Sequence, residues 1–318
     1  MANYSHSDQL FAGPWDIFVL CYPDVAAQYS AKQQSGNECG LSVAKQKHTI
    51  VLYCIATQQS PLKLSEYQHM IVEGAMVVII VAPFVKIHIF DAVLVHNITV
   101  DLVLEKESYC VYEHDFTNSN ADVIERTSVV TAHDNARLHY YVLYAGSSSI
   151  TQRYYSHAQG RGAQIALRGI FCATGDQKMI IESLQNHTSV DTQSEVLLRG
   201  FVADAATLCY KGTIAIDAYA VNTQARQEHK TLLLSDKASV ESVPVLEVLN
   251  KEVQCSHASA IGKLDEQALL YLQSRGLDRV YAQQMLLLNY IASVYGNEHN
   301  LFSINQKIPL LINNFNFL

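Results

Sequence analysis

The chain has 318 residues, of which 49% are hydrophobic and 16% are charged, as expected of a globular protein with a large core. Its formal net charge of −8 argues against nucleic acid as a partner, because binding to a phosphate backbone requires an excess of Lys and Arg. No signal peptide is recognisable, and the most apolar window (residues 75–85) has about half the length of a membrane-spanning helix, so we expect a cytoplasmic protein without membrane contact.

Residues 1–66 form an N-terminal segment of uncertain structure. It contains two apolar runs that are typical of strands, residues 17–22 and 49–55. A polar stretch joins them, and no function follows from this segment.

Residues 67–258 show the pattern of many short strands. Residues 85–90 and 98–102 alternate apolar and polar side chains, which is the period of a half-buried strand. Small-residue turns such as Asn135-Ala136 and Gly162-Ala163 recur at irregular spacing, and no helical pattern lies between the strands. Both a parallel β-helix and a β-sandwich fit this pattern. Because Asn-Gly and Asp-Gly hairpin turns are scarce, the β-helix is slightly favoured.

Residues 259–318 form a C-terminal region that begins with a helical pattern. Asp265 is placed to cap a first helix, and Arg275-Gly276 is a typical helix end, since glycine readily adopts the left-handed conformation found there.

A second helix follows, with Asp278 as its predicted cap. It is apolar nearly all round over residues 285–291, and such a helix is normally buried. It must therefore be covered either by its own domain or by another protein. The tail, residues 301–318, carries no firm prediction.

The sequence lacks the common catalytic signatures. A phosphate-binding Gly-x-x-x-x-Gly-Lys-Ser/Thr loop, Gly-x-Ser-x-Gly, His-Glu-x-x-His and paired Cys-x-x-Cys motifs do not occur. We therefore expect that the chain is not an enzyme by itself.

The cluster Cys255-Ser256-His257 is the one candidate for chemistry. The chain has seven cysteines without close pairing, which fits a reducing compartment better than a disulfide framework. In a strand, residues two apart point the same way, so the thiol and the imidazole would project together and suit iron or iron–sulfur chemistry. The alternative is a buried cysteine beside a histidine that hydrogen-bonds the following turn, and the residues alone favour this structural interpretation.

Several stretches resemble the SufB/SufD family, whose members are subunits of the SUF iron–sulfur cluster assembly machinery. The resemblance covers roughly residues 67–290 and is densest near the C-terminal end. The stretches that carry it there are residues 232–236 (LLLSD), 243–247 (VPVLE), 253–257 (VQCSH), 262–266 (GKLDE) and 271–276 (YLQSRG).

This resemblance implies a right-handed parallel β-helix followed by a small helical region. The end of the β-helix would pair a SufB-type with a SufD-type subunit, and the helical region would dock SufC, an ABC-type ATPase in which ATP hydrolysis is expected. The candidate docking residues are Asp265, Glu266, Leu269, Tyr271, Leu272, Arg275, Gly276, Met285 and Leu286.

The Cys-Ser-His form of the cluster is similar to SufD. SufB-type chains have a glutamate after this histidine, where the present chain has Ala258, and a cluster-related cysteine near residues 228–231, which here read EHKT. By this comparison His257 would contribute to iron or a nascent cluster at the partner interface, with Cys255 and His229 as neighbours. The chain alone is expected to bind no cofactor stably.

Three alternatives to a SufD-like subunit stay open. SufD proteins usually have glycine where this chain has Ala258, so a divergent subunit that forms a homodimer is one. A SufB-like, cluster-carrying scaffold is the second. The third is a β-helix enzyme acting on polysaccharide, which would need aligned carboxylates that Glu73, Asp91, Asp101 and Glu105 do not provide.

Overall fold

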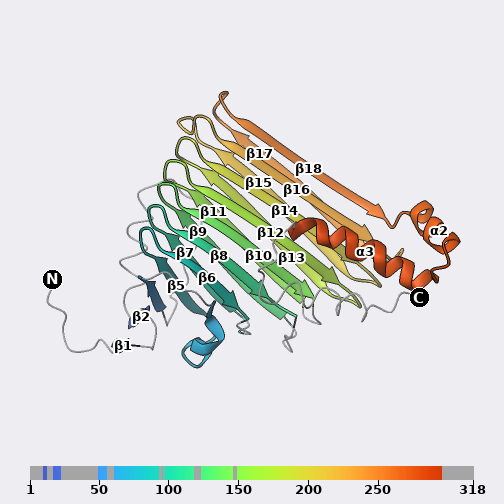
Figure 1. Ribbon diagram of the computed structural model, residues 1–318, viewed down its shortest axis with the longest axis horizontal. Coiled ribbons are helices and arrows are strands. Elements are labelled where there is room, and N and C mark those ends of the chain that lie inside the picture. The colour runs from blue at the N-terminus through green and yellow to red at the C-terminus, as the bar shows by residue number, and fades with distance from the viewer. Residues whose placement is uncertain are drawn as a thin grey trace.

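The computed structural model describes residues 10–12, 17–22, 49–55, 61–92, 95, 97–117, 123–145 and 149–295. Within them the chain winds as a parallel β-helix whose strands alternate between two long sheets, and two helices follow it (Figure 1). This confirms the predicted β-helix and excludes the β-sandwich, whose neighbouring strands would run antiparallel. The tail, residues 301–318, lies outside the described residues.

The larger sheet has ten strands. Its first two pairings are antiparallel and all later ones are parallel. In spatial order the strands are β1 (Leu10–Ala12), β2 (Ile17–Tyr22), β3 (Thr49–Cys54), β5 (Ala75–Val81), β7 (Asn97–Leu104), β9 (Val123–Ala132), β11 (Ser149–Ala158), β13 (Lys178–His187), β15 (Thr207–Ile216) and β17 (Ser239–Val248). The two apolar runs predicted as strands in the N-terminal segment are β2 and β3.

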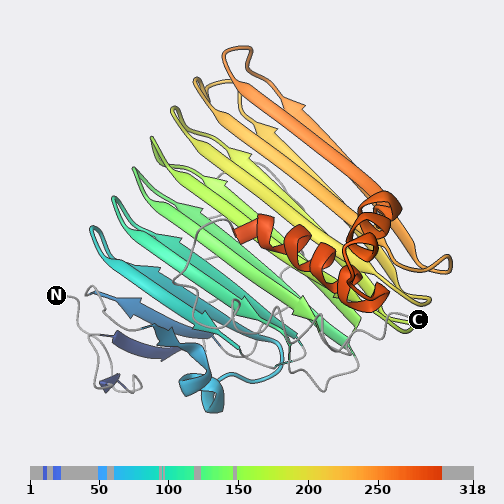
Figure 2. The same ribbon diagram turned by 45° about the vertical axis from the view of Figure 1, so that its right-hand side comes forward.

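The smaller sheet has eight strands, all in parallel pairing. They are β4 (Leu62–Lys63), which leads into the short helix η1 (Leu64–Met70), β6 (Lys86–Asp91), β8 (Tyr109–Asp115), β10 (Arg137–Ala145), β12 (Gln164–Ala173), β14 (Gln193–Val202), β16 (Gln224–Leu233) and β18 (Gln254–Lys263). Strands β17 and β18 are the last strands of their sheets and lie at the same end of the molecule (Figure 2). We call this end the open end.

The corners of the coils explain the recurring turn pairs in the sequence. Asn135 and Gly162 adopt left-handed backbone conformations, with φ angles of 53° and 69°, which Asn and Gly tolerate best. The next residue of each pair, Ala136 or Ala163, is wholly buried at the inside of the corner, where a larger side chain would not fit. The Asn135 N–H donates a hydrogen bond to the carbonyl oxygen of Arg161 (2.8 Å), so corners of successive coils stack on one another.

Stacked aromatic rings fill much of the space between the sheets. Phe116, Tyr144 and Phe171 follow one another in neighbouring strands, with ring centres 4.7 and 5.2 Å apart. Tyr112 and Tyr140 stack in the same way at 4.7 Å. Aromatic side chains bury large areas, so this stack stabilises coils that are distant in sequence.

The β-helix begins earlier in the chain and ends later than predicted from the sequence, where it was expected to span residues 67–258. Before this range, β3 pairs with β5 in parallel, and after it β18 continues to Lys263. Residues 258–263 are mostly small or polar, with weak strand propensity of their own. They are extended because the edge of β16 supplies hydrogen-bond partners along their whole length.

The first helix begins and ends where the sequence predicted, and the second begins at its predicted cap. Helix α2 spans Glu266–Ser274, and the side chain of Asp265 accepts hydrogen bonds from the N–H groups of residues 267 and 268. Gly276 ends it with a φ angle of 93°. Helix α3 spans Arg279–Tyr295, and the Asp278 carboxylate accepts a hydrogen bond from the N–H of residue 281 (2.9 Å).

Helix α3 lies across the outer face of the smaller sheet, as Figures 1 and 2 both show. One side of it is buried against strands β10, β12 and β14, through Leu287, Ile291 and Val294. The hydroxyl of Tyr295 donates a hydrogen bond to the carbonyl oxygen of Val142 (2.7 Å). The apolar helix is therefore covered on this side by its own chain. None of the described helices has the length and hydropathy to cross a membrane.

Candidate functional site

Cys255 and His257 lie on the interior-facing side of β18, at the open end. They are in register with Ala225 and Gln227 of β16, which are 3% and 2% exposed in the interior. Residues in register in parallel strands point the same way, and Cys255 packs against the interior cluster that contains Ala225. The thiol and the imidazole therefore project from one face, as predicted. His257 is exposed, and within the described residues no further coil covers β18.

The Cys255 thiol is free and half-buried. Burial raises its pKa above the ordinary value of a cysteine, so the neutral thiol dominates at neutral pH. Iron binds the thiolate, and a bound metal favours that form. Metal binding at this residue is therefore expected to release a proton.

His229 lies in the coil below the open end and is buried, 2% exposed. Both of its ring nitrogens are engaged, Nδ1 with the Ser242 hydroxyl (3.0 Å) and Nε2 with the Thr231 hydroxyl (2.9 Å). Burial, and next the charge of Arg199, lower the pKa of His229 to about 4. The structure thus places His229 next to the predicted site but does not present it as a ligand at the surface.

Cys255 also lines a groove of about 680 Å³. The groove runs along the first residues of β10, β12, β14, β16 and β18, and the glutamines that open four of these strands form part of its wall.

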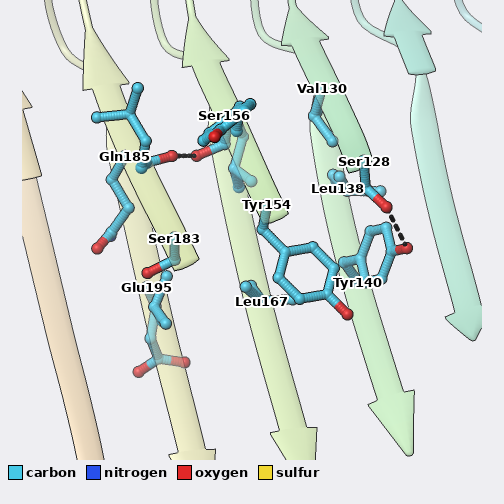
Figure 3. Close-up of a pocket in the computed structure, with 14 residues that line it drawn as sticks. Ser128, Val130, Leu138, Tyr140, Tyr154, Ser156, Leu167, Ser183, Gln185 and Glu195 are labelled. Carbon is cyan, nitrogen blue, oxygen red and sulfur yellow. Dashed lines mark hydrogen bonds between the residues drawn. The ribbon is translucent and has the colours of Figure 1, made fainter. Parts of the chain in front are cut away.

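A smaller cavity of about 20 Å³ lies deeper in the interior, with room for about one water molecule (Figure 3). Ser128, Tyr140 and Tyr154 line it on one side, and the Ser128 and Tyr140 hydroxyls are hydrogen-bonded (3.3 Å). Ser183 and Gln185 line it on the other side. The interior therefore combines apolar packing with pockets of polar groups.

Within the described part of the chain, no three or more His, Cys, Asp or Glu side chains are grouped so that they could hold a metal ion. Cys255 and His257 thus offer a metal at most two ligands. Iron–sulfur clusters are usually held by four. A cluster at the open end would need further ligands from outside the described residues.

The helix pair carries a second candidate surface. Leu270, Tyr271, Val280, Tyr281 and Met285 are between 42% and 63% exposed, and we call this set the helical apolar face. Large exposed apolar side chains gathered on one pair of helices are a candidate protein–protein contact site.

The other predicted docking residues lie around this face in different environments. Leu269 is wholly buried, so it stabilises the helix pair from within and cannot reach a partner. Arg275 stacks over the ring of Tyr271, 5.2 Å from its centre, and Glu266 forms an exposed ion pair with Arg279 (3.4 Å). Asp265 and Gly276 act as helix cap and terminator, and Leu272 and Leu286 are half-buried.

Comparison with known proteins gives a consistent result. Residues 53–290 match the family model described as "SUF system FeS cluster assembly, SufBD core domain". The chain is 23% identical to iron–sulfur cluster assembly protein SufB of Bacillus subtilis over 62% of its length, 30% identical to SufD of Escherichia coli over 34%, and 31% identical to a SufBD family protein of Mycobacterium bovis over 42%. These matches cover 42%, 26% and 36% of the relatives, so the chain spans less than half their length. Three quarters of its sequence lies inside the family model and its described residues fold as a parallel β-helix, so the chain belongs to the SufB/SufD family of SUF iron–sulfur cluster assembly proteins.

Proposed function

We propose that this chain is a SufD-like scaffold subunit of a SUF assembly complex. In this role it pairs at its open end with a SufB-type subunit, docks a SufC-type ATPase on its helices, and catalyses no reaction itself. The observation that carries the proposal is the position of Cys255 and His257, side by side on the uncovered last strand.

The open end fits a shared cluster site. Iron or a nascent cluster is the cargo here, and the two side chains supply a soft and a borderline ligand for iron. They lie on the interior side of the last described strand, within reach of a molecule that covers β17 and β18. A partner with two further ligands would complete the usual set of four.

The helical apolar face fits a large partner. Its five side chains lie on α2 and α3, on the sides that the β-helix leaves uncovered. The open end is built from different elements, so one chain can hold both partners at once. This agrees with an assembly in which the ATPase acts on the scaffold and not at the cluster site.

The test is cluster assembly on the co-expressed complex. We expect His257→Ala to lower the yield of cluster formed from iron and sulfide at least several-fold, with Cys255→Ala also reduced. His69→Ala serves as the control, because His69 is exposed like His257 but lies on the short helix η1, at the opposite end of the β-helix (Figure 1). Full cluster yield from His257→Ala would exclude His257 from the site.

A separate experiment tests the helical surface. A SufC-type ATPase should co-purify with the wild-type chain and fail to do so when Tyr271 and Met285 are both changed to Ser. The exposed pair Asp236→Asn and Lys263→Gln, on the β-helix side of α2, is the matched control. Retention of the ATPase by the helix variant would contradict the proposed docking face.

A SufB-like scaffold is the second candidate, because the chain matches relatives of both names. It predicts that the purified chain, reconstituted alone, shows an iron–sulfur absorbance band. The SufD-like role predicts that this band appears only with the partner present.

A further inference from the structure

The buried side chain directly beneath His257 has an unused hydrogen-bond acceptor. Gln227 of β16 is in register with His257 and is 2% exposed. Its side-chain oxygen, Oε1, has no hydrogen-bond partner. An unsatisfied buried acceptor is destabilising, so its retention calls for an explanation.

The surroundings of Gln227 restrict where this oxygen can find a donor. A Cβ atom added to Gly212 of β15 would lie 2.2 Å from Nε2 of Gln227 and 2.4 Å from the Tyr210 hydroxyl. The amide nitrogen therefore lies against the opposite sheet, in space that only glycine leaves free. On its own sheet Gln227 has two register neighbours, and one of them, Val196 in the coil below, has no side-chain donor.

The other register neighbour is His257, whose ring carries a donor in either tautomer. We propose that Gln227 is a positioning residue for His257: Oε1 accepts a hydrogen bond from one ring nitrogen and so leaves the other nitrogen unprotonated. This inference rests on the proposed function, in which His257 binds iron or a nascent cluster.

The chemistry of histidine ligands gives this contact its role. A metal-binding imidazole coordinates through one nitrogen, and its second nitrogen usually donates a hydrogen bond to an oxygen that fixes the tautomer and the ring orientation. Gln227 supplies such an oxygen from a buried, well-packed position. Gly212 acts indirectly, because it makes the room in which the Gln227 side chain lies.

Nitrogen NMR of the full chain, with ¹⁵N-labelled histidine and without iron or partner, tests the contact. The His257 signals are assigned by their loss in His257→Ala, and spectra are recorded at a pH where the imidazole is neutral. In the wild type we expect one nitrogen at a protonated-type and one at an unprotonated-type shift. In Gln227→Leu both should move towards the averaged position of a free imidazole, and Gln227→Glu, which keeps an acceptor of the same length, should stay closer to the wild type.

Gln185→Leu is the matched control. Gln185 is also an interior glutamine with an unpartnered Oε1, 1% exposed, but it belongs to β13 of the other sheet. Unchanged His257 shifts in Gln227→Leu, or equal shifts in Gln185→Leu, would overturn the proposal. If Gln227→Leu does not fold, Gln227→Met removes the same acceptor with a more adaptable side chain. Because the measurement needs no cluster, its result is independent of the assembly test on His257→Ala.

Discussion

Buried polar side chains in this β-helix are held by partners from other coils. Asp91 and Arg126, 0% and 1% exposed, form an ion pair, and the Tyr112 hydroxyl donates a hydrogen bond to the same carboxylate (2.5 Å). Asp91 lies in the smaller sheet and Arg126 in the larger, so the pair ties the two sheets together. Both side chains are shielded from bulk water.

Removing one member of this pair should therefore be costly. We expect Asp91→Asn to lower the free energy of unfolding by about 3–5 kcal/mol, because it leaves the Arg126 charge buried without its counter-ion. Arg126→Met combined with Asp91→Asn should cost less than the sum of the two single changes. Urea unfolding measures all three variants, and the exposed pair Asp236 and Lys263 is the control, where Asp236→Asn should change nothing measurable. Additive costs in the double variant would contradict a direct interaction.

Buried histidines make stability depend on pH. His187 is wholly buried between the hydroxyls of Thr192 and Ser194, at 2.7 Å from each, and burial lowers its pKa from 6.5 to about 4. The unfolded chain therefore binds more protons than the folded chain between these two pH values, and stability falls as pH is lowered through this range. Below the folded-state pKa, the total decrease in the free energy of unfolding caused by His187 is about 3 kcal/mol.

Replacing this histidine should flatten the pH dependence. His187→Gln keeps a donor and an acceptor but has no titrating group, so the slope of unfolding free energy against pH between 6.5 and 4 should be smaller than in the wild type. Equilibrium unfolding at several pH values gives both slopes. Some slope should persist, because burial also lowers the pKa of His229 and His114. Identical slopes in the two proteins would mean that His187 titrates normally.

The sequence predicted residue roles where they depend on local spacing. The helix caps Asp265 and Asp278 and the common direction of Cys255 and His257 follow from positions a few residues apart, and the structure confirms them. The sequence did not predict that His229 is buried, because the hydrogen-bond partner of His229, Ser242, comes from the opposite sheet. Gln227 was missed although it alternates with His229, a period of two that marks one face of a strand.

At the scale of the elements, different residues of helix α3 have different roles: some stabilise the fold, and others are exposed for binding. Leu287 is wholly buried against the smaller sheet, whereas Met285, two residues earlier, is 42% exposed. The same helix therefore holds the C-terminal region to the β-helix and presents part of the helical apolar face.

We expect the two residues to respond differently to truncation. Leu287→Ala should cost about 2–5 kcal/mol, because it leaves a cavity between helix and sheet, and should increase protease cleavage around α3. Met285→Ala should leave unfolding nearly unchanged while weakening ATPase binding. Limited proteolysis with thermal unfolding distinguishes them. Equal destabilisation by both changes would mean that α3 is buried on both sides.

Helices, strands and turns were predictable from the sequence where a local residue pattern specifies them. The corners, with glycine or asparagine before alanine, and the strands of alternating apolar residues are local features, and β2 and β3 matched their apolar runs. The extension of β18 to Lys263 was not predictable, because an edge of β16 and not the propensity of residues 258–263 keeps that stretch extended. The position of α3 depends in the same way on an apolar outer sheet face that no helical pattern reveals.

At the scale of the whole molecule, the β-helix ends in two unequal edges. N–H groups of successive strand residues point alternately to the two sides, and Ser239 of β17 and Gln254 of β18 donate to the preceding coil. The even-numbered residues of β17 therefore direct their N–H groups to the free edge. One of these residues is Pro244, which has no N–H group. In β18 the odd-numbered residues from Cys255 to Lys263 direct their N–H groups to the free edge, and none of these residues is a proline. Proline at an edge blocks strand pairing, so β18 is the edge whose N–H groups are free of this block.

This asymmetry leads to a prediction about assembly. Ile261 is 44% exposed on β18, and its N–H points to the free edge, so Ile261→Pro removes a donor that pairs with no described strand. We expect thermal unfolding to change little, while the complex with a SufB-type partner, or with a second copy of this chain, is lost in size-exclusion chromatography. Ala260→Pro is the informative contrast, because residue 260 donates to β16 and its loss should destabilise the last coil itself. If Ile261→Pro still assembles, the partner does not extend the smaller sheet through β18, and the contact must rest on the side chains of the open end alone.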